Sequence, residues 1–469
     1  MDRRRLLGVV GTGATAILGG CSGFLGGGDD RSGTDDSGGG GSGGAPHEWP
    51  SVGRIPRNHA NNPTAETPRG ESEADLFSRR WAWRPPTAEE AAGDDETTFT
   101  GDVSGAVGDD EYLYTVVSGT AILPDGETEP LNTLFAVDPG SGETVWQSSF
   151  TDGSALGGVV PPTVTDDRIV LAGRALHAFR DDGDRAWQVD PAQVAAGPPV
   201  ATGDELYLPT NGGVECRALA DGGERWTAPV GAVTGSSTVA VADDTVYVSR
   251  ASEVVALARN DGTEQWRSGA GTESAVSPGI RTTVGSPVVD DDRVYVAGGL
   301  SVAAQGDNAA LVALDRTGGT EQWRYRPEPS AAGEGPPVAG VYGLPALVDD
   351  RLIAVVRVTG GDPTGFSEFG LVAVDTAEGT ELWRSALSPT LGTSVVGAGD
   401  TVYAGTGGAP ADETENALQG FTVADGSPVG VGETDGMGGI SIGQPAAVVD
   451  DAVVVPTRDG LVAFGDTGG

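Results

Sequence analysis

The sequence predicts an all-β protein, an eight-bladed β-propeller of four-stranded antiparallel blades. Short runs rich in Val, Leu and Tyr alternate with Asp, Gly and Thr turn signals throughout the chain, which is typical of strands. Glycine recurs four positions before tryptophan, at intervals of about 40 to 60 residues, the range that marks a repeat architecture. An acidic or Gly-Asp turn also precedes a hydrophobic run once in each interval.

One complete unit runs from Gly285 to Trp323. Its runs around Val294–Val296 and Leu311–Leu314 are too short for helices and are bounded by residues that favour tight turns. The unit therefore reads as a four-stranded antiparallel meander. Its Gly-Trp pair recurs as Gly142/Trp146, Gly183/Trp187, Gly222/Trp226, Gly262/Trp266, Gly319/Trp323 and Gly379/Trp383.

The acidic turns number eight, which sets the number of units. They are Asp109-Asp110, Asp166-Asp167, Gly203-Asp204, Asp243-Asp244, Asp291-Asp292, Asp349-Asp350, Gly399-Asp400 and Asp450-Asp451. The seventh unit keeps a turn at Asp425-Gly426 but has no tryptophan, and the eighth ends before a fourth strand can form.

The missing strand is expected from the other end of the chain. Arg80-Trp81-Ala82-Trp83-Arg84 is similar to the fourth-strand sequence Gln322-Trp323-Arg324. If it pairs with Leu461–Phe464, the first and last segments share one blade, and only short, protected sheet edges remain. N-terminal strand pairing in the C-terminal blade is thus predicted to close the ring.

The pattern Ala-Val-Asp-x-x-x-Gly-x-x-x-Trp, seen at Ala136–Trp146 and Ala373–Trp383, resembles the pyrroloquinoline-quinone-type propeller repeat. Quinoprotein dehydrogenases and the bacterial outer-membrane barrel-assembly lipoprotein share that repeat, and the resemblance covers about residues 46 to 467. It implies that each tryptophan docks between blades on a Gly-containing turn, where glycine tolerates positive φ. The implied docking residues are Trp83, Trp146, Trp187, Trp226, Trp266, Trp323 and Trp383, with Gly142, Gly262, Gly319 and Gly379.

Charge excludes some partners. The 469 residues carry a formal net charge of −40, and all 28 basic residues are arginine. Such a surface is similar to those of proteins from salt-loving archaea, where strong salt screens the repulsion. Nucleic acid is an unsuitable partner for this charge, and so is an anionic membrane surface.

Residues 1–21 read as a targeting segment. Arg3-Arg4-Arg5 precedes an apolar run, and Leu18-Gly19-Gly20-Cys21 resembles a lipobox. We expect export by the twin-arginine route and a lipid on Cys21, which would hold the protein at the outer face of the cytoplasmic membrane; an ordinary cleaved signal is the alternative. Residues 22–45 are a Gly/Ser/Asp-rich flexible tether, 46–80 a lead-in segment and 81–467 the propeller.

Binding is expected at one end of the ring. In the meander, the acidic turns and the Gly turns lie at one end, while the connections of variable length lie at the other. The expanded connections are 119–132, 268–285, 298–308, 325–344, 359–370, 406–416 and 430–444. This loop-rich face should bind a protein partner or extracellular ligand through Arg281, Arg326, Tyr342, Phe366, Phe369 and Met437; the alternative is that these are solvent-covered insertions.

No catalytic or metal-binding residue is predicted. The three histidines, His47, His59 and His177, are scattered, and Cys216 is expected to be a small buried residue. We therefore expect a non-catalytic, monomeric binding scaffold without a cofactor. The alternative is a quinoprotein dehydrogenase that oxidises alcohols or sugars with pyrroloquinoline quinone and calcium, although the adjacent cysteines of many such enzymes are missing.

Overall fold

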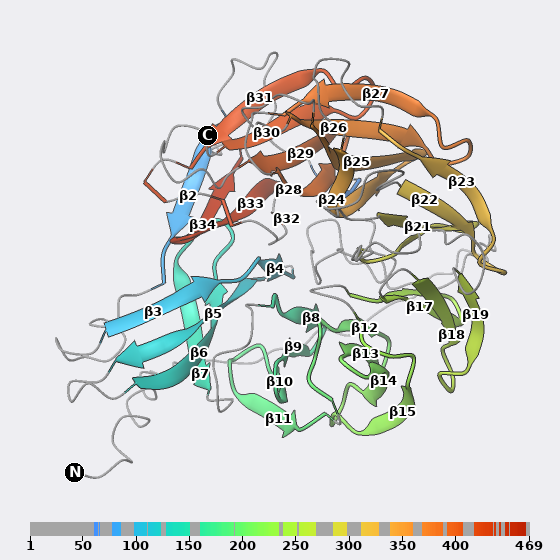
Figure 1. Ribbon diagram of the computed structural model, residues 1–469. Helices are drawn as coiled ribbons and strands as arrows, with labels where there is room; N and C mark the ends of the chain where they lie inside the picture. Colours follow the sequence, from blue (N-terminus) through green and yellow to red (C-terminus); the bar gives the residue numbers. More distant parts are fainter. Residues whose placement is uncertain are drawn as a thin grey trace, which may run out of the picture.

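The computed structural model shows eight four-stranded sheets arranged round a ring (Figure 1). It describes residues 61–63, 65, 77–85, 98–109, 111–122, 128–150, 160–191, 193–233, 238–250, 253–268, 285–297, 311–327, 338–359, 368–387, 392–406, 417–434, 436–437, 440–441, 446–449 and 451–465. These residues form strands, turns and irregular segments, with no helix among them. The predicted all-β, eight-bladed propeller is confirmed.

Each sheet is here called a blade, numbered along the chain, and its strands run in order from the axis to the rim. Blade 1 contains β3 (Thr98–Val103) and β4 (Val107–Gly108), which both pair with β5 (Leu113–Ile122), then β6 (Thr128–Val137) and β7 (Thr144–Phe150). Blade 2 contains β8 (Thr163–Thr165), β9 (Arg168–Ala172), β10 (Leu176–Phe179) and β11 (Arg185–Val189). Blade 3 contains β12 (Val200–Thr202), β13 (Glu205–Thr210), β14 (Gly213–Ala218) and β15 (Glu224–Ala228).

The next three blades repeat the pattern. Blade 4 contains β16 (Ala240–Ala242), β17 (Thr245–Arg250), β18 (Glu253–Ala258) and β19 (Glu264–Ser268). Blade 5 contains β20 (Val288–Val289), β21 (Arg293–Ala297), β22 (Leu311–Asp315) and β23 (Glu321–Tyr325). Blade 6 contains β24 (Val338–Val348), β25 (Arg351–Thr359), β26 (Glu368–Asp375) and β27 (Glu381–Ala386).

The last two blades include strands from the start of the chain. Blade 7 contains β28 (Gly392–Ala398), β29 (Thr401–Thr406), β30 (Ala417–Thr422) and β31 (Pro428–Glu433), and β1 (Asn61–Asn62) lies parallel to β28. Blade 8 contains β32 (Ala447–Val449), β33 (Ala452–Thr457), β34 (Gly460–Phe464) and, as its fourth strand, β2 (Arg79–Trp83).

The ring closes as predicted. Strand β2 pairs antiparallel with β34, with Trp83 opposite Leu461 and Trp81 opposite Ala463. In Figure 1, the blue strand β2 lies beside the red strand β34. The two ends of the chain therefore complete one sheet, so that blade 8 has four strands like the others and β34 is not left as an edge strand.

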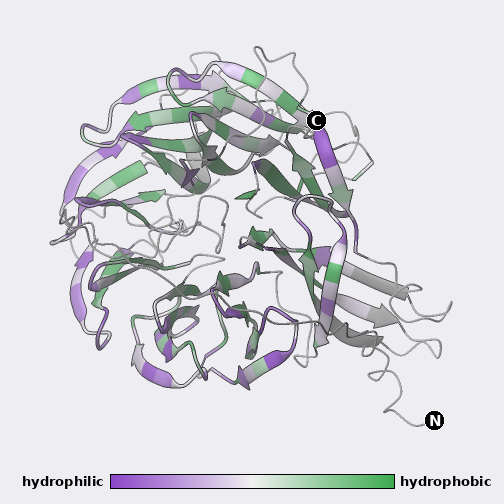
Figure 2. Ribbon diagram, turned by 180° about the vertical axis from the view of Figure 1, so that it is seen from behind, coloured by the Kyte–Doolittle hydropathy of each residue, from purple (hydrophilic) through white to green (hydrophobic). Residues whose placement is uncertain are grey.

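The core lies between the blades. A strand packed on both faces has no polar side, so the second and third strands are nearly continuous runs of Val, Leu, Ala and Tyr. In β33 and β34, every residue from Ala452 to Thr457 and from Gly460 to Phe464 is buried. The outermost strands alternate exposed and buried residues, so the hydrophobic colour in Figure 2 lies mainly on the inner strands.

Blades 1 and 6 are taller than the sequence suggested. Strands β5 and β6 each have 10 residues and β24 has 11, because part of each predicted loop continues the sheet. Four stretches that were predicted as loop are therefore strand, namely 119–122, 128–132, 338–344 and 368–370. The β-branched residues in these stretches favour that continuation. Both blades extend the sheet at the end of the ring where the second and third strands connect.

The described part of the lead-in segment belongs to the ring. Asn61 and Asn62 are buried and lie opposite Gly397 and Ala398, the end of the innermost strand of blade 7. The backbone oxygen of Asn62 accepts the N–H of Gly399 at 3.0 Å. A Cβ at position 397 would lie 2.6 Å from Oδ1 of Asn61, so this close approach requires glycine.

Candidate functional site

The contact between two neighbouring blades is here called a seam, numbered by its blades. At seven seams, an indole from one blade lies over a turn glycine of the next blade. The pairs are Trp81 on Gly142, Trp146 on Gly183, Trp187 on Gly222, Trp226 on Gly262, Trp266 on Gly319, Trp323 on Gly379 and Trp383 on Gly426. Gly262 has φ +72°, and a Cβ there would lie 2.5 Å from Cε3 of Trp226, so both its conformation and its contact require glycine.

The first tryptophan of this set is not the one expected. The sequence assigned the docking role to Trp83, whereas Trp81 covers Gly142 and donates its Nε1–H to the carbonyl of Pro139 at 2.8 Å. Trp83 packs edge-on against Phe135, with ring centroids 5.1 Å apart, and donates to Oγ1 of Thr144. The reason is the register of β2 against β34. Trp81 lies opposite Ala463, just as Trp266 lies opposite Ala256 in blade 4.

The indole N–H groups form a second repeated contact. In seam 3/4, Nε1 of Trp226 donates to the carbonyl of Arg259 at 2.9 Å, and Trp187, Trp266, Trp323 and Trp383 make the same contact in theirs. Nε1 of Trp146 has no acceptor among the described residues. The turn that Trp146 covers in blade 2 is one residue shorter than the matching turn in blade 4. Gly183 comes five positions after Ala178, whereas Gly262 comes six positions after Ala256.

The acidic turns hold buried tyrosines, a role that the sequence analysis missed. Tyr114, on the second strand of its blade, donates its hydroxyl to Oδ2 of Asp109 at 3.0 Å. Tyr295 makes the same contact with Asp290, and the ring of Tyr295 packs on Trp323 of its own blade. A Tyr five residues after an acidic turn residue was the available signal. Carboxylate acceptors make such hydrogen bonds stronger than neutral ones.

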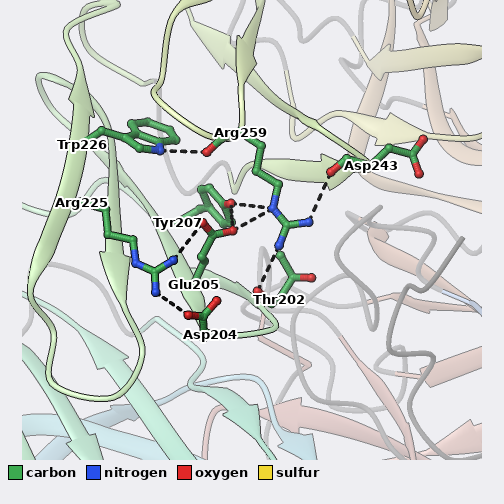
Figure 3. A network of polar contacts seen from close by, with 8 residues as sticks. All are labelled: Thr202, Asp204, Glu205, Tyr207, Arg225, Trp226, Asp243 and Arg259. Carbon is green, nitrogen blue, oxygen red and sulfur yellow. Dashed lines mark hydrogen bonds and ion pairs between the residues drawn. The ribbon is translucent and has the colours of Figure 1, made fainter.

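Seam 3/4 carries a network of polar contacts (Figure 3). Oε2 of Glu205 accepts from the hydroxyl of Tyr207 at 2.6 Å and from Nε of Arg259 at 2.8 Å. Arg259 belongs to blade 4 and also donates to the carbonyls of Thr202 and Asp243, so that one side chain spans both blades. Arg225 pairs with Glu205 from the rim.

These contacts shift the pKa values of Glu205 and Tyr207. Burial works to raise the pKa of Glu205, but hydrogen bonds from Tyr207 and Arg259 outweigh it and lower the pKa. Burial, followed by the hydrogen bond to Glu205, raises the pKa of Tyr207. The arrangement therefore favours a charged Glu205 and a neutral Tyr207 at neutral pH, which is what an ion-paired clamp between blades needs. It presents no nucleophile to solvent.

Seam 2/3 holds an ion pair inside the core. Arg217 and Glu215 lie on the face of blade 3 that meets blade 2, and Nη2 of Arg217 is 2.6 Å from Oε2 of Glu215. Nη1 of Arg217 donates to the carbonyl of Gly222 at 2.9 Å. Oε1 of Glu215 has no hydrogen-bond partner among the described residues. A buried pair of this kind is stabilising only while both partners are present.

Cys216 lies opposite Trp226, where most blades have alanine. Its side chain is fully buried, and burial raises the pKa of its thiol to about 12. A protonated, buried thiol is unreactive, so Cys216 fills space in the core.

The structure describes four of the six predicted binding residues. Arg281 and Phe366 lie outside the described residues, and Tyr342 lies in β24, where its backbone is opposite Val355. Arg326 is exposed just after β23. Phe369 and Met437 are only 7% and 4% exposed, respectively, which contradicts their assignment to a binding surface. Phe369 lies at the start of β26 and Met437 lies four residues after β31, and both bury their apolar side chains against the core.

The remaining predicted sites fall outside the described part of the chain. This applies to Cys21, the targeting segment and the tether. Within the described residues, no group of three or more His, Cys, Asp or Glu side chains is placed to hold a metal ion. No helix long and apolar enough to cross a membrane occurs there either.

Several solved propellers share this fold. BamB from Moraxella catarrhalis is 18% identical over 83% of this chain and 99% of its own, with a TM-score of 0.51. The quinohemoprotein alcohol dehydrogenases ADHIIG of Pseudomonas putida HK5 and of Comamonas testosteroni are each 12% identical. They match 90% and 91% of this chain and 81% and 82% of their own, both with a TM-score of 0.60. At such identities the likeness shows the fold alone.

Sequence comparison identifies the family. No curated protein sequence is significantly similar to this chain. A family model described as outer membrane protein assembly factor BamB, however, matches residues 130–309 and 307–469, which together are well over half of the chain. With its eight blades and its repeated Trp-Gly seams, the chain therefore belongs to the PQQ-like propeller family that this BamB model describes.

Proposed function

We propose that this protein is a non-catalytic binding scaffold, exported, lipid-anchored through Cys21 and held at the outer face of the cytoplasmic membrane. The observation that carries the proposal is the difference between the two ends of the ring. At the end with the acidic turns, polar side chains either bind the neighbouring blade, as Arg259 binds Glu205, or cap the backbone of their own turn, as Asp315 does. Groups engaged in this way are not available to a ligand.

The opposite end differs in height from blade to blade. Blades 1 and 6 extend their central strands there, while blades 2, 3 and 4 join their second and third strands by short connections. Variable segments on a constant scaffold are the common location of binding function. The partner is a protein or another extracellular ligand, and the family membership is compatible with a scaffold role without specifying that partner.

The anchor is supported by the sequence alone. The arginine-rich start, the Leu-Gly-Gly-Cys pattern at Cys21 and the Gly/Ser-rich tether form a continuous export, lipidation and spacing signal. Replacing Cys21 with serine should move the protein from the membrane fraction to the soluble fraction of the producing cells. Retention in the membrane fraction would contradict the anchor without affecting the binding proposal.

The binding proposal is tested by comparing two sites on intact cells. One photo-cross-linking residue replaces Arg326, which is exposed at the loop-rich end, and it should capture a partner. The same cross-linking residue in place of Leu382, which is 44% exposed on the outer strand β27, should not capture that partner. Capture should then be lost in the double variant Arg281→Glu/Phe366→Ala. It should persist in the matched control Arg185→Glu/Val145→Ala on outer strands. Equal capture from both cross-linker positions, or no loss in the double variant, would count against the proposal.

A quinoprotein dehydrogenase is the second candidate. The observation that favours it is the shared propeller with two quinohemoprotein alcohol dehydrogenases at a TM-score of 0.60. The test is oxidation of alcohols or sugars by the purified protein reconstituted with pyrroloquinoline quinone and calcium, followed with an artificial electron acceptor. Turnover that depends on both additions would replace the scaffold proposal.

A further inference from the structure

Seam 7/8 is the exception among the eight, because β31 contains no tryptophan. In blade 7, Gly430 lies opposite Gly420. These are the positions that Trp226 and Cys216 occupy in blade 3. Blade 7 thus has glycine at both positions where the other blades place an indole and a small residue. The space next to the buried Tyr403 must be filled by another side chain, since protein interiors are close-packed.

Phe77 of the lead-in segment fills that space. Its ring centroid is 5.8 Å from that of Tyr403, while the Tyr207–Trp226 and Tyr247–Trp266 distances are 6.0 and 5.9 Å. A Cβ added at Gly420 would lie 2.7 Å from Cζ of Phe77. The backbone N–H of Phe77 donates to the carbonyl of Val431 at 2.7 Å. Phe77 therefore replaces the missing tryptophan from a different part of the chain.

The absence of a tryptophan in β31 has a physical reason. An indole needs a Gly turn on the next blade, between that blade's third and fourth strands. In blade 8 the third strand is β34 and the fourth is β2, which come from opposite ends of the chain. No such turn joins them; instead, the N–H of Gly465 donates to the carbonyl of Ser78 at 3.0 Å. An indole in β31 would have no turn to cover.

The same short segment also forms seam 8/1. Four residues after Phe77, Trp81 covers Gly142 and donates to Pro139, and Trp83 packs on Phe135 of blade 1. Phe77–Trp83, here called the clip, therefore supplies the aromatic anchors for both sides of blade 8. Each of the six remaining seams depends on a single tryptophan from its own blade.

We propose that the clip is a detachable unit and that blade 8 is where the ring opens. Because Phe77, Trp81 and Trp83 lie on one short stretch, releasing one weakens the others, so seams 7/8 and 8/1 should open together. Among the described residues, no other stretch supplies the aromatic anchors of two seams. When the clip detaches, it exposes a groove that fits an extended peptide with the spacing of Phe77, Trp81 and Trp83. The occupant of this groove is the protein's own clip.

Hydrogen exchange of the full-length protein tests the coupling. Phe77→Ala should accelerate amide exchange on both sides of blade 8, in β31 and in β7, by about a hundredfold or more given the loss expected for a buried Phe. The control Trp226→Ala should accelerate exchange in blades 3 and 4 only. Acceleration in β31 with β7 unchanged, or a uniform increase over all blades, would overturn the proposal.

A milder variant covers the case in which Phe77→Ala fails to fold. Gly420→Ala introduces only the residue that most other blades have at this position, and its methyl group would displace the Phe77 ring. It should reproduce the two-sided acceleration. A labelled peptide of residues 75–85, which keeps Phe77, should bind a full-length Phe77→Leu protein, whose groove is unaltered, at least tenfold more tightly than wild type, and a scrambled peptide should not. Equal binding of the peptide to both proteins would show that the clip does not detach.

Discussion

The two faces of blade 3 are built from alternate residues of the same strands, yet they join their neighbours in different ways. Toward blade 2, the face combines Leu206 and Leu208 with the buried pair of Glu215 and Arg217. Toward blade 4, it presents Tyr207, Cys216 and Trp226 to valines and leucine of that blade, and its charged groups lie at the end of the ring.

The difference shows that position decides what a charge contributes. In seam 2/3, both ions have lost water, so each depends on the other and removing one leaves an uncompensated charge. In seam 3/4, Glu205 and Arg259 are partly exposed, so solvent screens them and the apolar contacts of Trp226 carry most of the stability. Seam 2/3 should therefore be the more sensitive to a single charge removal.

The largest expected effect is at Arg217. Arg217→Met leaves Glu215 buried without its ion partner and should lower the free energy of unfolding by roughly 3–5 kcal/mol. The double variant Glu215→Leu/Arg217→Met should recover most of that loss, because a well-packed apolar pair can replace a buried ion pair at little cost. Denaturant unfolding of all three proteins at one salt concentration measures the difference. A double variant as unstable as the single one would contradict this account of seam 2/3.

The next effect concerns Tyr207 and has a pH signature. Tyr207→Phe removes a hydrogen bond to a charged acceptor and should lower the free energy of unfolding by roughly 1.5–3 kcal/mol at neutral pH. Because the folded pKa of Tyr207 is raised above its unfolded value near 10, its contribution is complete below about pH 10 and is lost as pH rises further. The stability gap between wild type and variant should therefore narrow in alkali. A constant gap from pH 8 to pH 12 would show that Tyr207 does not titrate in this way.

The smallest effect compares Trp226 with Trp146. Trp226→Phe removes an indole N–H that donates to Arg259, whereas Trp146→Phe removes one without an acceptor among the described residues. Both variants remove the same ring atoms, but Trp226 is buried whereas Trp146 is only partly buried, so the difference contains the hydrogen bond, about 1 kcal/mol, together with the greater burial of Trp226. Trp226→Phe should therefore be the less stable of the two by at least that amount in thermal and denaturant unfolding. Equal losses would mean that the shorter turn at Gly183 has no energetic consequence.

Much of the fold could be predicted because its signals are local and repeated. The turn glycines, the acidic turns and the short Val-rich runs recur in each unit, and their repetition gave the blade number and the closure by β2. The candidate site was less predictable. Phe369 and Met437 sit in segments that read as loops, but burial depends on which neighbours surround a side chain, and those neighbours are distant in sequence.

The errors at the closing blade have the same origin. Trp81 and Trp83 are equally suitable indoles by sequence, and only the pairing of β2 with β34 decides which one reaches Gly142. Phe77 gave no signal, because its partners Gly420, Gly430 and Tyr403 lie more than 300 residues away along the chain.

The amino-acid sequence by itself determined the strands, their turns, the number of blades and the closure by the first strand, because a strand's period and a turn's glycine act over a few residues. Tertiary structure alone decided which indole covers which glycine, that Glu215 and Arg217 meet inside seam 2/3, and that Phe77 completes blade 7. Those contacts join segments from different blades, and their energy depends on packing and desolvation, which exist only once the ring has formed.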